Sequence, residues 1–138
     1  MARTVSRLLY AASATIFAFG GLAHALVYAK KSGAEITASN LSPFFQAELK
    51  ALWLCDSTTL IALAAAFFYL AVKPTATNRT VVLLMALVPA GTTFVLYAFL
   101  GAFYAAHLLL LATSIAVVAS LLTSETAQSR SAAAGSHA

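Results

Sequence analysis

The feature that most constrains the fold is a run of 45 consecutive residues, 80–124, that contains no Asp, Glu, Lys or Arg. As one straight helix this run would be about 67 Å long, roughly twice the thickness of a bilayer core. We therefore expect it to fold back on itself, and Gly101 marks the natural place for the turn. Two further apolar stretches, residues 8–29 and 51–72, precede it. The pattern predicts a polytopic membrane protein with four helices.

Composition agrees with a membrane protein and argues against other classes. The chain of 138 residues is 62% hydrophobic and only 9% charged, whereas a soluble domain has about 25% charged residues. The net charge of +4 is spread along the chain without a basic cluster. Nucleic-acid binding is therefore not expected, because a phosphate backbone is bound through clustered Lys and Arg.

The expected fold is all-α, with one transmembrane domain over residues 1–123 that forms an up-down-up-down bundle of four helices. The helices are expected at about residues 8–29, 43–72, 81–100 and 102–123, each long enough to cross a bilayer. Ser42 and Pro43 are typical of a helix start, with an N-cap followed by proline at the first helical position. Residues 30–41 are expected to form the largest loop. The small, polar residues 124–138 are expected to form a disordered tail.

The distribution of Lys and Arg predicts the orientation. The side with both termini has five such residues: Arg3, Arg7, Lys73, Arg79 and Arg130. The other side has three: Lys30, Lys31 and Lys50. Because cytoplasmic segments carry the excess of positive charge, both termini are expected in the cytoplasm. We expect an integral protein of the inner (plasma) membrane of a bacterium.

Polar side chains within the spans are the candidate functional residues, because such groups are costly in a membrane. His24 is expected about 7 Å below the end of the first span, and Asp56 is similarly shallow in the second. Tyr97 and His107 flank the turn at Gly101 at a similar depth. All four helices thus place polar groups in one layer, towards the non-cytoplasmic side.

Further residues extend this layer into an expected pocket. Glu48 shares a helix face with Asp56 in the headgroup region, and Tyr104 shares a face with His107. Trp53 lies near the interface as an aromatic anchor. Pro89 frees a backbone carbonyl, with Thr93 near enough to satisfy freed groups. The expected ligand-binding residues are Glu48, Trp53, Thr93, Tyr97 and Tyr104, in a polar pocket that opens to the outer surface.

Several chemistries remain open for this layer. His24 and His107 are the candidate ligands for a haem b between the first and fourth helices, or for a divalent metal, with Asp56 and, in a wider set, Glu48 as further ligands. Alternatively, Asp56, His24 and His107 act as an acid/base couple or bind a lipid-like or small amphipathic ligand. A purely structural pairing of Asp56 with either histidine is the simplest alternative.

The main hypothesis is a small accessory or ligand-binding membrane subunit, and the alternative is a membrane enzyme or electron carrier that uses haem or metal. The bilayer is one expected partner. Small residues spaced four apart, such as Ala14 and Ala18 or Ala112 and Ala116, favour close helix contacts, either within the bundle, in a homo-oligomer or in a larger membrane complex. Hydrolase, metalloprotease and nucleotide-binding motifs are absent from the sequence, so no standard enzyme class is indicated.

Overall fold

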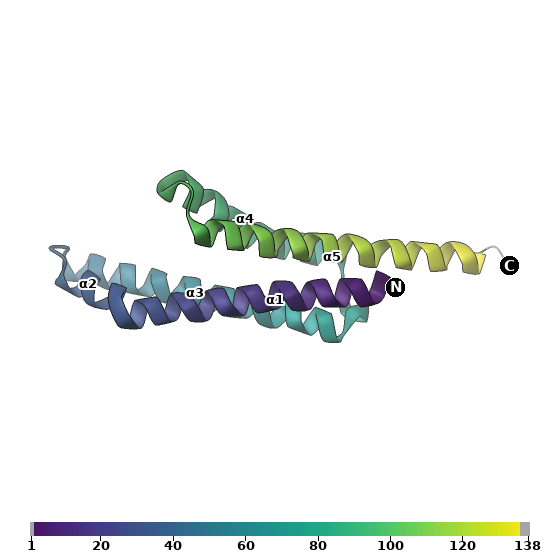
Figure 1. Cartoon of the computed structure of the whole chain (residues 1–138), viewed down its shortest axis with the longest axis horizontal. Helices are drawn as coiled ribbons and strands as arrows, with labels where there is room; N and C mark the ends of the chain where they lie inside the picture. The colour runs from purple at the N-terminus through teal and green to yellow at the C-terminus, as the bar shows by residue number, and fades with distance from the viewer. Residues whose placement is uncertain (1, 136–138) are drawn as a thin grey trace.

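The computed structural model describes residues 2–135, and it describes side chains for residues 3–123. The described chain is all-α (Figure 1). Its elements are α1 (Ala2–Val27), the π-helical segment η1 (Tyr28–Ser32), α2 (Gly33–Ala38), α3 (Pro43–Val72), the short 3₁₀ turn η2 (Pro74–Ala76), α4 (Arg79–Leu100) and α5 (Tyr104–Gly135).

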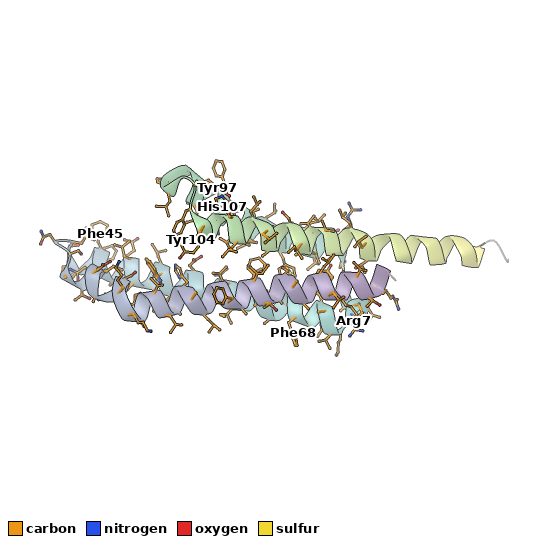
Figure 2. All side chains as sticks on the ribbon, in the orientation of Figure 1. Arg7, Phe45, Phe68, Tyr97, Tyr104 and His107 are labelled. Carbon is orange, nitrogen blue, oxygen red and sulfur yellow. The ribbon has the colours of Figure 1, made fainter. Side chains whose placement is uncertain are left out.

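Four helical segments are long and apolar enough to cross a membrane: Arg3–Ala38, Pro43–Val72, Arg79–Leu100 and Tyr104–Thr123. Large apolar side chains point outwards all around them (Figure 2). Phe94 and Phe99, for example, are 75% and 83% exposed. A surface of this kind suits lipid, because water would penalise so much exposed hydrocarbon. The helices therefore indicate an integral membrane protein in contact with the bilayer.

The long helices form two hairpins, and successive helices run antiparallel (Figure 1). Helix α1 packs along α3 within the first hairpin and along α5 of the second, while α4 packs mainly on α5. Helices α3 and α4 are joined by η2 and approach each other near that turn, where Leu70 and Val82 line a shared hollow. They do not pack along their whole length. The pair of α1 and α5 therefore forms the centre of the molecule.

The first helix continues beyond the point where a loop was expected. Residues 30–38 are helical, and only residues 39–42 interrupt the path to α3, so the prediction of a loop over 30–41 was wrong for most of its length. No proline interrupts this stretch, and Lys31 and Glu35 form an ion pair at 3.9 Å one turn apart, which favours helix. The first hairpin consequently projects beyond the turn of the second (Figure 1).

Two local signals in the sequence are confirmed. Ser42 caps α3, since its hydroxyl accepts a hydrogen bond from the backbone N–H of Phe45 at 3.5 Å, and Pro43 takes the first helical position. The chain turns between α4 and α5 at Gly101, whose φ of +66° is a conformation that residues with a side chain rarely adopt. Asn78 caps the start of α4 through its side-chain oxygen.

The core consists of stacked aromatic rings and small residues. The ring of Phe67 on α3 stacks with Phe17 at 5.7 Å and with Tyr10 at 6.2 Å between centroids. The α1–α5 contact is lined by buried alanines, which let the two backbones approach closely: Ala14, Ala112, Ala116 and Ala119. These small residues thus serve packing within the molecule, and the expected homo-oligomer stays a prediction.

Helix α5 extends past Thr123, the expected end of its span. Its backbone is helical to Gly135, and it projects beyond the other helices (Figure 1). Side chains from residue 124 onward and residues 136–138 lie outside the described part of the chain. The disorder expected for 124–138 therefore remains a prediction.

Candidate functional site

His24 on α1 contacts two consecutive residues of α3, Asp56 and Ser57. Its Nδ1 lies 2.9 Å from the hydroxyl oxygen of Ser57. Its Nε2 lies 3.6 Å from a carboxylate oxygen of Asp56, an ion-pair separation longer than a direct hydrogen bond. The side chains of His24 and Asp56 are 29% and 40% exposed, whereas Ser57 is buried. The expected link between the polar groups of the first and second spans is therefore present, with Ser57 as an additional member.

Trp53 holds this group together from one turn earlier on α3. Its indole Nε1–H donates a hydrogen bond to the backbone carbonyl of His24 at 3.0 Å. Its ring also stacks on the imidazole, with centroids 4.5 Å apart and planes inclined by 14°. Tyr28 is tilted against the indole at 6.5 Å. The imidazole is thus held by the Trp53 ring and by the Ser57 hydroxyl, while the indole N–H holds the backbone of His24.

Backbone features of α1 allow this close approach. A Cβ atom at Gly21 would lie 3.1 Å from the carbonyl oxygen of Ser57 and 3.0 Å from the side chain of Ile61. Only glycine lets α1 and α3 come this near at the level of His24. One turn after His24 the helix changes to the π-helical segment η1, an irregularity that is frequently found at functional sites.

A cavity of about 340 Å³ lies beside this group, between the first hairpin and the end of the second. His24, Trp53 and Asp56 form its polar edge, and the exposed Tyr104 of α5 adds a phenol to the lining. The rest of the lining is apolar: Ile16, Phe17, Phe19, Gly20, Ala23, Val27, Leu60, Leu96, Leu100, Phe103, Ala105, Leu108 and Leu109. An apolar chamber with a few convergent polar groups is the usual form of a small-molecule site.

The polar edge can hold a proton in two arrangements. In one, neutral His24 has its proton on Nε2, directed at Asp56, and the Ser57 hydroxyl donates to Nδ1. In the other, His24 is an imidazolium whose Nδ1–H donates to Ser57, and the Ser57 hydroxyl then donates to the carbonyl of Trp53, 3.2 Å away. The two arrangements differ by one proton on Nδ1 of His24 and by the direction of the Ser57 hydroxyl.

His107 and Tyr97, by contrast, do not line this cavity. The Nδ1–H of His107 donates to the backbone carbonyl of Phe103 at 2.8 Å. Its ring packs edge-on against Tyr97 of α4, with centroids 5.4 Å apart. Figure 2 shows this pair near the turn of the second hairpin, with Tyr104 on the side nearer to the first hairpin. The structure therefore divides the expected polar layer into two separate groups.

Two other expected ligand-binding residues also lie away from the cavity lining. Thr93 is buried, and its hydroxyl donates to the carbonyl of Pro89 at 2.7 Å. Glu48 is exposed on the part of α3 that belongs to the projecting hairpin. The site residue that sequence reasoning missed is Ser57. Its position one turn after Trp53 and next to Asp56 was the available signal.

The arrangement offers little to a metal ion. Within residues 3–123, no group of three or more His, Cys, Asp and Glu side chains is placed to hold one. His24 and His107 each have a protein hydrogen-bond partner on Nδ1, and only His24 lines the cavity. A haem or metal bound jointly by the two histidines thus has no support in this geometry.

The fold and the site define a class: a small protein of four apolar, potentially membrane-spanning helices with a cavity at one end of the helix pairs. Comparison of the chain with models of protein families, with curated proteins and with solved structures finds no match. Function must therefore be inferred from the site itself.

Proposed function

We propose that this protein is a ligand-binding membrane subunit that holds a small amphipathic or lipid-like molecule in the cavity beside His24 and Asp56. The observation that carries the proposal is the contrast between the apolar lining and its single polar edge. Such a chamber would bury a hydrocarbon chain, at about 0.8 kcal/mol per methylene group. The polar head of the same molecule would then meet His24, Asp56 and Tyr104.

The proposal includes an orientation. With both termini in the cytoplasm, as the Lys and Arg distribution favours, the cavity lies in the outer layer of the membrane. Phe19 and Tyr104 line the cavity and are also exposed on the outside of the molecule, so we propose that a lipid-like molecule enters from the side of the bundle. A bacterial inner membrane is the setting we propose.

A matched pair of variants tests the binding. Ala105 lines the cavity, so Ala105→Phe fills it, whereas Ala65→Phe adds the same ring at an exposed position of α3. Native mass spectrometry of protein purified in mild detergent should show a bound small molecule in the original protein and in Ala65→Phe, and not in Ala105→Phe. Equal retention by all three proteins would contradict the proposal.

The redox alternative is tested on the same material. A Soret band in the absorption spectrum, or a stoichiometric metal content, that disappears in His24→Ala and in His107→Ala would favour haem or metal ligation by the two histidines. We expect neither signal, because His24 pairs with Asp56 at the edge of the cavity and His107 does not line the cavity.

A further inference from the structure

We infer that the cavity selects amphipathic molecules with a cationic head, such as a primary or quaternary amine on a hydrocarbon chain. This inference rests on the proposed function and adds the charge class of the ligand. It follows from the charges along the cavity wall, from the kinds of ring in that wall and from the size of the chamber.

The charge balance of the polar edge is the first argument. Asp56 is the only acidic residue that lines the cavity, and the lining contains no Lys or Arg. When Asp56 is ionised and His24 is neutral, the polar edge has one net negative charge. When His24 is an imidazolium, the net charge of the edge is zero. With Asp56 ionised, neither state is net positive. A cationic head would therefore gain a carboxylate partner, whereas an anionic head would have to approach that carboxylate without a free cation.

Basic residues nearby do not reverse this balance. Lys30 and Lys50 each lie six residues from His24 and Asp56 along their helices, about 9 Å at the helical rise. Neither Lys30 nor Lys50 lines the cavity. Their effect on a charge inside the chamber is accordingly weaker than that of Asp56, which forms part of the wall.

The aromatic lining is the second argument. Rings from three helices and from the turn of the second hairpin surround the chamber: Phe17, Phe19, Trp53, Phe103 and Tyr104. Aromatic faces attract ammonium groups, most strongly when water is excluded. The Asp56 carboxylate together with these aromatic rings therefore suits an alkylated amine. The side chains of the lining that could donate a hydrogen bond to an anionic head are those of His24, Trp53 and Tyr104. Of these, the indole N–H of Trp53 already donates to the backbone carbonyl of His24.

The volume of the cavity limits the size of the head group and the length of the hydrocarbon chain that it can hold. A volume of about 340 Å³ is near the lower end for small-molecule sites. It suits a short single-chain amphiphile, or one chain of a larger lipid with the remainder outside. Three probes with the same octyl chain therefore isolate the head group: octylammonium, nonanoate and octanol.

The test uses the full chain at neutral pH in micelles of a nonionic, sugar-headed detergent, which carries no amine or carboxylate that could compete for the cavity. Trp53 is the only tryptophan and it lines the cavity, so its fluorescence reports occupancy directly. We expect a half-saturating concentration for octylammonium that is at least about tenfold below that for nonanoate, equivalent to about 1.4 kcal/mol, with octanol between them. In Asp56→Asn this difference should fall to about twofold or less.

The outcomes separate the two proposals. Equal or tighter binding of nonanoate by the original protein would overturn the charge selection, and this comparison needs no variant. If the binding were still saturable and lost in Ala105→Phe, the proposed ligand-binding function would stand. If no probe gave a saturable change, or if Ala105→Phe responded like the original protein, the ligand-binding function and the charge selection would both be overturned.

Discussion

Trp53 contacts both the backbone and the side chain of His24. Its indole N–H donates to the His24 backbone carbonyl at 3.0 Å, and its ring stacks on the imidazole with centroids 4.5 Å apart. One side chain of α3 therefore fixes both the backbone and the side chain of a residue on α1. Because Asp56 and Ser57 follow Trp53 on the next turn, this contact also sets the register in which they meet His24.

Replacing Trp53 by Phe should weaken the helix contact. Trp53→Phe keeps an aromatic ring and removes the N–H donor, which should lower the free energy of unfolding by about 1 kcal/mol. Thermal unfolding in detergent, followed by circular dichroism, measures the change. Phe99→Leu is the control, because Phe99 is exposed. A loss no larger than that of the control would show that the indole bond contributes nothing to stability.

Two glycines within helices should respond in opposite ways to the same substitution. Gly21→Ala would place a methyl group 3.1 Å from the carbonyl of Ser57 and should destabilise the protein by about 1–3 kcal/mol, as overpacking does. Gly91→Ala meets nothing within 4 Å and should stabilise α4 by up to about 1 kcal/mol. Chemical denaturation of the two variants side by side gives the comparison. The reverse order of stability would mean that α1 and α3 are further apart than described.

The hydrogen bond between α1 and α5 should make a measurable contribution to the free energy of unfolding. The hydroxyl of Ser13 donates to the carbonyl of Ala112 at 2.9 Å, and both residues are buried. Ser13→Ala should cost about 0.6 kcal/mol, with an upper value of about 1.7 kcal/mol for bonds between helices in membranes. Thr15→Val is the control, since the Thr15 hydroxyl bonds only within its own exposed turn. Equal unfolding midpoints for the two variants would argue against the α1–α5 bond.

The proposed orientation can be tested with single cysteines. Cys55 is the only cysteine, so a Cys55→Ser background allows one reporter at a time. Glu35→Cys lies on the projecting hairpin and Asn78→Cys at the opposite end of α3. In intact cells a membrane-impermeant maleimide should label Glu35→Cys and leave Asn78→Cys unlabelled until the cells are opened. Labelling with the opposite preference would place both termini outside and the cavity in the inner layer.

The sequence alone determined the number of long helices and several of their ends. Length and absence of charge required four apolar helices, Ser42 and Pro43 marked the start of α3, and Gly101 marked the turn of the second hairpin. These features follow from local chemistry: the thickness of a bilayer, the capping of backbone N–H groups and the conformational freedom of glycine. The helical extension to Ala38 was not foreseen, because a polar, charged segment between two apolar spans resembles a loop.

Only the tertiary structure decided which polar residues share a site. Tyr104 and His107 lie three residues apart and were expected to share a helix face, yet Tyr104 lines the cavity and His107 packs against Tyr97. Asp56 was expected near either histidine, and packing at Gly21 brought it to His24. The physical reason is that a helix that is apolar all round carries no polar stripe to fix its rotation in lipid. That rotation is set by the packing of small residues and rings against neighbouring helices.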